Sequence, residues 1–197
     1  MKMCGRYYIE PDSRDETLLA LLDELARERG NCEAHAAMRL GEIFPAQIAP
    51  ALTSDGPRMM KWGYTCSKNR VINARSETAL EKPMFRNSML FRRCLLPASG
   101  YYEWQRTPGG SKTKQKFALF TSAPLLFMAG LWRQEQGEDL PVFVILTRCA
   151  APGLAWLHDR MPVILPPQAQ RAWLNKTADP AAAMALVIEE MDFAPAG

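Results

Sequence analysis

The residue with the most distinctive reactivity in this 197-residue chain is Cys4. If residues 1–3 are removed, Cys4 carries a free α-amine and a thiol two carbons apart, a 1,2-aminothiol. An aldehyde reacts with such a group first at the amine, giving an imine, and the thiol then closes a five-membered thiazolidine ring. Reference pKa values near ~7.8 for an α-amine and ~10.4 for lysine leave roughly 10% and roughly 0.04% neutral at pH 7. An N-terminal Cys4 therefore suits aldehyde capture far better than a lysine, although position alone favours the commoner inert cysteine.

Two further stretches combine polar groups of different kinds with apolar runs. The segment 71–78, V-I-N-A-R-S-E-T, ends an apolar run with the amide of Asn73 and the guanidinium of Arg75. The segment 97–104, P-A-S-G-Y-Y-E-W, places Glu103 between large aromatic residues. Such surroundings desolvate a carboxylate and raise its pKa toward acid–base usefulness. The alternatives are that Asn73 closes a turn and that Glu103 faces water on an edge strand.

The third stretch, 158–165, reads H-D-R-M-P-V-I-L and begins with His158, one of two histidines. The imidazole pKa matches proton transfer near neutrality, which makes His158 the strongest acid–base candidate. Its alternative is a hydrogen-bonded structural histidine. Each of these groups, taken singly, is more often structural than functional.

The composition bounds the class of protein. Apolar residues make up 48% and charged residues 23%, with a net charge of +3, which are ordinary globular values. Sixteen arginines stand against eight lysines. The planar arginine fork suits phosphate oxygens, which favours a nucleic-acid partner.

The cysteines, five in number and without a C-x-x-C pair, indicate neither a disulfide framework nor a zinc site. We expect no metal and no cofactor. The chain has no apolar run of transmembrane length and no signal-peptide core. We therefore expect a cytoplasmic protein that makes no membrane contact and is associated with the nucleoid when bound to DNA.

The elements that must position these groups are mostly short strands. A capping box at 13–16 predicts a first helix with an apolar stripe, ending near Gly30. Further helices are predicted from 166 to Trp173 and from Asp179 onward. Strands are predicted at 7–9, 58–64, 70–74, 91–96, 100–105, 116–121, 125–132, 141–147 and 161–165. The stretch 31–57 reads as irregular, 109–112 as a hairpin loop and 193–197 as a loose tail.

This pattern predicts an α+β fold with strongly curved, mostly antiparallel, barrel-like sheets and peripheral helices. We expect one domain over residues 1–197 and a monomer, because no repeat or linker interrupts the chain.

Four motifs in order, C-G-R-Y, N-A-R-S-E-T, G-Y-Y-E-W and H-D-R-M-P-V-I-L, resemble those of the SOS response-associated peptidase (SRAP) family. The stretch F-M-A-G-L-W at 127–132 is similar to a fifth family motif. The resemblance runs from about residue 4 to the helix ending at Trp173. It implies an SRAP-like domain that cross-links covalently to abasic sites in single-stranded DNA and shields the lesion during the DNA damage response.

The resemblance also implies a role for each matching residue. Cys4 supplies the amine and thiol, Asn73 holds the amine and the sugar oxygen, and Glu103 shuttles a proton that opens the sugar. His158 handles protons as the imine and the ring form. The residues that match DNA-contacting positions are Arg6, Arg75 and Arg160 for phosphates, and Pro45 and Trp104 for the flanking bases. Stacking on tryptophan is worth ~1–3 kcal/mol per base whatever the sequence.

Two departures from the family pattern concern the N-terminus and one loop. In the family the cysteine directly follows the initiator methionine, whereas here it is the fourth residue and follows Met3. We therefore expect translation to start at Met3, or the chain to cleave itself before Cys4. The connection 64–70 is shorter and more polar than in the family, which bears on affinity and on preference for duplex junctions. The match around Pro45 is the least complete.

Two other functions remain open from the residues. A cysteine peptidase would use His158 as base on a protein substrate, and a non-catalytic binder of single-stranded DNA would need no free Cys4. Only the cross-linker predicts a covalent DNA adduct.

Overall fold

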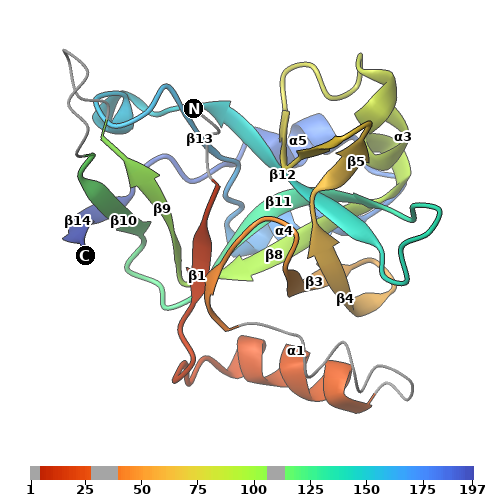
Figure 1. The fold of residues 1–197 in the computed structure, drawn as a ribbon, viewed down its shortest axis with the longest axis horizontal. Coiled ribbons are helices and arrows are strands. Elements are labelled where there is room, and N and C mark those ends of the chain that lie inside the picture. The colour runs from red at the N-terminus through yellow and green to blue at the C-terminus, as the bar shows by residue number, and fades with distance from the viewer. Residues whose placement is uncertain (1–4, 28–39, 106–113) are drawn as a thin grey trace.

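The computed structural model describes residues 5–27, 40–105 and 114–197, which form a mixed α+β fold (Figure 1). The helices among them are α1 (Glu16–Arg27), α3 (Pro83–Phe91), α4 (Pro167–Leu174) and α5 (Pro180–Met184), with a 3-10 turn at Pro152–Leu154. The strands are β1 (Tyr7–Ile9), β2 (Gly41–Ile43), β3 (Ile48–Thr53), β4 (Gly56–Trp62), β5 (Tyr64–Cys66), β6 (Asn69–Val71), β7 (Asn73–Arg75), β8 (Arg93–Ala98), β9 (Gly100–Trp104), β10 (Lys116–Phe120), β11 (Leu126–Arg133), β12 (Val142–Cys149), β13 (Arg160–Pro162) and β14 (Asp192–Ala196). The predicted α+β class is confirmed.

The larger sheet has the order β11-β8-β3-β4-β12-β13, with β7 also paired to β12. A further pairing between β11 and β12 closes five of these strands into a ring. The strands pair antiparallel except where β12 runs parallel to β4 and β7. The prediction of strongly curved, mostly antiparallel sheets is confirmed, and the curvature takes the form of this ring.

The second sheet has the order β14-β10-β9-β1-β2 and lies beside the ring (Figure 1). All of its pairings are antiparallel, and β1 pairs with β9 through Tyr7 opposite Tyr101. This pairing brings the start of the described chain alongside the strand that carries Glu103.

One apolar core joins the two sheets. Tyr7 of β1 packs edge-on against Trp62 of β4, with ring centroids 5.3 Å apart, and Trp62 stacks on Phe143 of β12 at 6.1 Å. The indole N–H of Trp62 donates to the carbonyl oxygen of Ile72 at 2.9 Å. These contacts fix β1 relative to the strand β7 that begins with Asn73.

Arg93 of β8 has a buried guanidinium that donates hydrogen bonds at the C-terminal ends of two helices. It donates to the main-chain oxygens of Met89 and Leu90 at the end of α3, of Trp173 and Asn175 at the end of α4, and of Ala178. The last carbonyls of a helix have no partner within it, and Arg93 supplies that partner. Burial lowers the pKa of Arg93, against the raising effect of Asp179.

The N-terminus of α1 differs from the predicted capping box. The side chain of Asp15 accepts hydrogen bonds from the N–H groups of Thr17 and Leu18, at 3.0 and 3.1 Å, and is the cap. Ser13 accepts only the N–H of Asp15, at 3.3 Å. Helix α5 begins as predicted, because Asp179 accepts the N–H of Ala181 at 2.9 Å.

The C-terminal tail differs from the prediction of a loose segment at 193–197. Residues Asp192–Ala196 form β14, an edge strand paired antiparallel with β10 over five residue pairs. Phe193 anchors this strand, since its ring packs on Phe117 and Trp156. The predicted loop 109–112 and the helix end at Gly30 lie outside the described residues.

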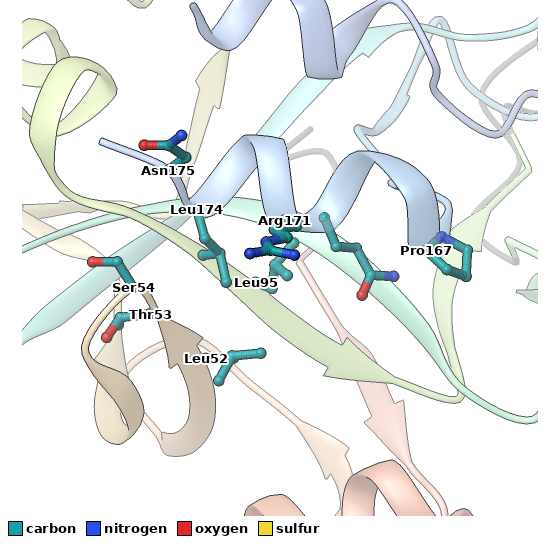
Figure 2. Close-up of a pocket in the computed structure, with 9 residues that line it drawn as sticks. Leu52, Thr53, Ser54, Leu95, Pro167, Arg171, Leu174 and Asn175 are labelled. Carbon is teal, nitrogen blue, oxygen red and sulfur yellow. The ribbon is translucent and has the colours of Figure 1, made fainter. Parts of the chain in front are cut away.

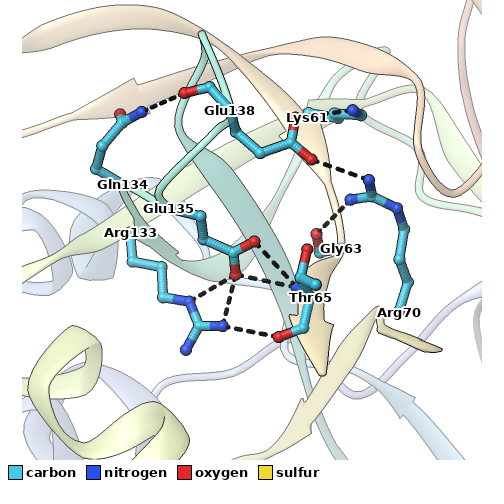
Figure 3. A network of polar contacts seen from close by, with 8 residues as sticks. All are labelled: Lys61, Gly63, Thr65, Arg70, Arg133, Gln134, Glu135 and Glu138. Atoms are coloured by element: carbon cyan, nitrogen blue, oxygen red, sulfur yellow. Dashed lines mark hydrogen bonds and ion pairs between the residues drawn. The ribbon is translucent and has the colours of Figure 1, made fainter. Parts of the chain in front are cut away.

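The predicted short, polar connection at 64–70 is a hairpin of β5 and β6 braced by two carboxylates (Figure 3). Glu135 accepts the N–H of Thr65 at 3.0 Å, and Glu138 is bonded to cations on both sides. Hydrogen bonds from Lys61 and then Arg70 lower the pKa of Glu138. The cations paired with the two carboxylates are Lys61, Arg70 and Arg133. The two carboxylates therefore offset two of these three positive charges within the protein.

Candidate functional site

The strand β9 separates two predicted site residues by the alternation of its side chains. Glu103 is 3% exposed and lies on the same face as the buried Tyr101. Trp104 and Tyr102 are half-buried on the opposite face. Glu103 and Trp104, which are neighbours in the G-Y-Y-E-W motif, therefore lie on the core-facing side and the outer side of one sheet.

The N-terminal segment runs along β9 toward Glu103. The N–H of Tyr102 donates to the carbonyl oxygen of Arg6 at 2.9 Å, which continues the register of Tyr7 opposite Tyr101. By the same register Gly5 lies opposite Glu103. Cys4, the predicted nucleophile, lies outside the described residues.

His158 is 5% exposed, and its Nδ1 atom lies close to the two residues that follow it in the chain. Its Nδ1 lies 2.8 Å from Oδ1 of Asp159 and accepts the N–H of Arg160 at 3.1 Å. The described contacts of the imidazole are therefore with the two residues that follow it in the chain.

Aromatic contacts connect the neighbourhood of His158 with that of Glu103. Phe117 of β10 lies directly opposite Glu103 in the sheet, so the two side chains share a face. The ring of Phe117 packs edge-on against Trp156, at 5.2 Å, two residues before His158. Trp156, two residues before His158 in the chain, therefore packs on the residue that lies opposite Glu103 in the sheet.

Asn73 and Arg75 lie on β7, which β12 holds in place through parallel pairing of Asn73 with Ile145 and of Arg75 with Thr147. Asn73 is half-buried and Arg75 is exposed. The preceding Ile72 accepts the indole hydrogen bond of Trp62, which links this strand to β1. The N-A-R-S-E-T motif is thus fixed between the ring and the N-terminal strand.

Arg160 is engaged by a residue that sequence reasoning did not assign. Its two terminal nitrogens contact the two carboxylate oxygens of Glu77 at 2.6 and 2.7 Å, and one of them also donates to the carbonyl oxygen of Thr147 at 2.7 Å. The hydrogen bonds from Arg160 lower the pKa of Glu77 to about 2. Glu77 lies inside the N-A-R-S-E-T motif, but only the meeting of β7, β12 and β13 reveals its partner.

The predicted DNA-contacting residues Arg6 and Trp104 meet on the outer face of the five-stranded sheet. The guanidinium carbon of Arg6 lies 4.9 Å from the Trp104 ring centroid and 4.4 Å from that of Phe44. Pro45 follows Phe44 in a turn whose next residue, Ala46, has φ of 71°. Arg6 and Trp104 therefore meet at one place, where Phe44, the residue before Pro45, adds an aromatic surface.

Two tyrosines extend this face. The rings of Tyr8 and Tyr102 stack with centroids 5.0 Å apart. Burial, followed by the charge of Tyr102, raises the pKa of Tyr8 to about 12, and burial likewise raises the pKa of Tyr102. Both phenols stay neutral near pH 7.

A cavity of about 590 Å³ lies elsewhere, between β3, β8 and α4 (Figure 2). It is lined by Leu52, Leu95 and Leu174 together with polar groups such as Arg171, and it contains none of the predicted site residues. Within the described ranges no group of three or more metal-ligating side chains occurs, and no helix there is long and apolar enough to span a membrane.

Comparison with known proteins was made on sequence and on structure. The family described as SOS response associated peptidase (SRAP) matches residues 3–194. The abasic site processing protein YoqW of Bacillus subtilis is 32% identical over 90% of this chain and 83% of its own length. YedK of Escherichia coli, with the same description, is 34% identical over 88% of this chain and 80% of its own.

A similar eukaryotic protein and two solved structures extend the comparison. HMCES of Xenopus tropicalis, also described as an abasic site processing protein, is 32% identical over 86% of this chain, which spans about half (53%) of that protein. A Bacteroides thetaiotaomicron protein shares the fold with a TM-score of 0.77 at 22% identity, covering 98% of this chain and 91% of that one. A phage-related protein of Bordetella bronchiseptica has a TM-score of 0.73 at 26% identity, covering 98% and 94%.

Proposed function

This chain belongs to the SOS response associated peptidase family, and we propose that it processes abasic sites in DNA by forming a covalent cross-link through Cys4. The relatives described as abasic site processing proteins support the substrate. The observation that carries the proposal is the β1–β9 pairing, which directs the N-terminal segment toward Glu103 while Arg6 and Trp104 lie on the other face.

The proposed reaction starts by opening the abasic sugar. The sugar exists mainly as a closed hemiacetal, and Glu103 moves a proton from the C1′ hydroxyl to the ring oxygen, which frees the C1′ aldehyde. Burial keeps water away from this carboxylate, which favours a proton shuttle over simple solvation. Asn73 orients the sugar oxygen and the amine of Cys4.

The covalent steps then follow from the 1,2-aminothiol. The neutral amine of Cys4 attacks C1′, and the carbinolamine loses one water to give an imine. The thiolate adds to the imine carbon, and the nitrogen takes up a proton to complete the thiazolidine. His158, held by the carboxylate of Asp159, supplies and accepts protons in these steps. The net change is one oligonucleotide added and one water lost.

The arginines that we propose to contact DNA differ in their exposure and in their partners within the protein. Arg75 is exposed and can contact phosphate directly, whereas Arg160 is already held by Glu77 and serves mainly to position β13 and His158. We propose that Trp104, which lies beside Arg6, and Pro45 cover bases that flank the missing one. We propose that the substrate is single-stranded, because extruded or unpaired bases are needed for such stacking.

The test uses a chain that begins at Cys4, mixed with a single-stranded oligonucleotide carrying one abasic site. A product that survives denaturing electrophoresis is expected with this chain and absent with Cys4→Ala. An oligonucleotide with the intact base is the matched control and should give no such product. Adduct formation by Cys4→Ala would overturn the role of the thiol and point to an imine at the α-amine or at a lysine, whereas binding without any adduct would favour a non-catalytic DNA-binding protein.

Cleavage of an added peptide that depends on Cys4 would instead support the cysteine peptidase alternative. Peptidase activity confined to a chain that retains residues 1–3 would support self-cleavage as the way in which Cys4 becomes N-terminal.

A further inference from the structure

The outer face of the five-stranded sheet carries a set of cations and rings beyond the predicted DNA contacts. We call this set the outer-face cluster; its members are Arg6, Tyr8, Glu42, Phe44, Tyr102, Trp104 and Lys116. They come from β1, β2, β9, β10 and the turn after β2. Strand alternation places them opposite the core-facing Tyr7, Tyr101 and Glu103.

A single carboxylate holds the two cations of the cluster. One oxygen of Glu42 lies 2.5 Å from the ammonium of Lys116, and the other lies 3.2 Å from the guanidinium of Arg6. The side chains of Arg6 and Glu42 are 30% and 32% exposed and that of Lys116 is 14% exposed, so water and solutes reach the Arg6 side of this ion pair more readily than the Lys116 side. An ion pair open to solvent is weak and is readily exchanged for another anion.

Each cation also lies over an aromatic ring. The ammonium of Lys116 is 3.8 Å from the ring centroid of Tyr102, and Arg6 lies between Phe44 and Trp104. Cations held over rings keep their position when their anion is exchanged. The rings themselves offer flat surfaces on one strand, two residues apart.

We propose that the carboxylate of Glu42 occupies a DNA phosphate site, and that single-stranded DNA displaces it from Arg6 and Lys116. A phosphodiester, like a carboxylate, presents two anionic oxygens and can bridge the same two cations. A base beside that phosphate then stacks on Trp104. This inference rests on the proposed function and adds Lys116 to its binding surface.

The displacement has a consequence for selectivity. Every DNA strand must displace the Glu42 carboxylate from Arg6 and Lys116, so phosphate contacts alone bind intact DNA weakly. An abasic strand is retained by the covalent bond instead, which lets the protein leave undamaged DNA readily.

The test compares Glu42→Gln with Asp192→Asn, which removes an exposed carboxylate from β14 of the same sheet. Affinity for a labelled, intact single-stranded oligonucleotide is measured by fluorescence anisotropy at several salt concentrations. Glu42→Gln should bind roughly fivefold tighter at low salt and lose this gain as salt rises, while Asp192→Asn should change affinity less than about twofold. Equal effects of the two variants, or weaker binding by Glu42→Gln, would overturn the proposal.

A second comparison separates displacement from general charge repulsion. In the double variant Arg6→Gln, Lys116→Gln, the added change Glu42→Gln should give no gain in affinity, because neither cation remains for the Glu42 carboxylate to pair with. A full gain in that background would mean that Glu42 acts only through its net charge, and would refute the phosphate site. Lys116→Gln alone should weaken binding to intact strands, and unchanged affinity would remove Lys116 from the site.

These readouts use intact DNA and need no covalent chemistry. If a chain that begins at Cys4 forms no adduct with abasic DNA, the cross-linking proposal fails, while the anisotropy series still supports or refutes the Glu42 site. Thermal unfolding of each variant verifies that the affinities refer to folded protein.

Discussion

Glu103 and Trp104 are neighbours in sequence but act on opposite faces of β9. Glu103 is buried beside core aromatics, whereas Trp104 covers the guanidinium of Arg6 on the outer face. We propose proton transfer for the first and DNA contact for the second. The two roles should therefore separate experimentally.

Replacing Glu103 with Gln should slow adduct formation by at least about a hundredfold at saturating DNA, because a neutral amide cannot carry the ring-opening proton. Affinity for intact single strands should stay within about twofold. Trp104→Ala is the matched control, and it should weaken binding while leaving the saturated rate nearly unchanged. Rates come from quenched time courses and affinities from anisotropy. Parallel loss of rate and affinity in Glu103→Gln would indicate a positioning role instead.

The ion pair between Glu77 and Arg160 makes a prediction about pH. Its hydrogen bonds hold the pKa of Glu77 at about 2, below the ordinary value of 4.5. A depressed folded-state pKa means that the stabilisation is present in full above about pH 4.5 and is lost as the pH falls toward 2. Glu77→Gln should therefore lower Tm at pH 7 but not at pH 2, by a modest amount because the Glu77 side chain is 44% exposed.

Thermal unfolding of wild type and Glu77→Gln between pH 2 and pH 7 measures this difference directly. A difference in Tm that stays constant down to pH 2 would contradict the assignment.

Residue identities in the candidate site could be predicted from sequence motifs, but their partners could not. The carboxylates Glu77 and Glu42 find their cations through strand pairings between distant segments. Nothing local in the sequence pairs Glu77 with Arg160, which is 83 positions away. Such pairings depend on topology rather than on spacing.

The strands with strong local patterns were predicted well, and the missed elements have weak ones. The predicted strands at 100–105, 116–121, 125–132 and 141–147 match β9 to β12 within two residues at their ends. Strands β2 and β3 were missed because Pro45 and Pro50 break the apolar pattern, although an edge or bulge position tolerates proline. Helix α3 was not predicted, although it starts at a proline without a side-chain cap just as the predicted α4 does.

The cap of α1 can be tested at the level of the element. Asp15→Ala should lower the free energy of unfolding by about 1 kcal/mol, because two N–H groups lose their acceptor. Ser13→Ala removes one longer hydrogen bond outside the helix and should cost less than half as much. Urea denaturation measures both. A larger loss in Ser13→Ala would restore the capping box expected from the sequence.

Strand β9 is also confined by its first residue. A Cβ atom at Gly100 would meet the carbonyl oxygen of Leu119 and the ring of Tyr8. Only glycine allows β9 to approach β10 this closely. The close approach keeps Glu103 and the outer-face cluster in register with β1.

Across the whole molecule, the ring and the five-stranded sheet share one apolar core. Its buried residues come from β1 and β9 on one side and from β4 and β12 on the other. Ile72 and Leu157, the sequence neighbours of Asn73 and His158, belong to the same core as Tyr7 of β1. The second core cluster, under α4 and α5, depends on Arg93 and Trp173.

Arg93→Met should lower the free energy of unfolding by about 3 kcal/mol or more, because five carbonyl groups lose a buried charged donor. Arg93→Lys should recover part of this loss, since an ammonium has three donors rather than five. Guanidinium denaturation provides the measurement. A cost below about 1 kcal/mol for Arg93→Met would mean that water replaces the side chain at these helix ends.

The central claim is tested most directly by the intact mass of the protein before and after mixing with an abasic single-stranded oligonucleotide. We predict a protein that begins at Cys4, and a product heavier by one oligonucleotide less one water. A chain that begins at Cys4 and gains no mass from the abasic strand would contradict covalent capture. A gain of the same size with Cys4→Ala would contradict the role of Cys4.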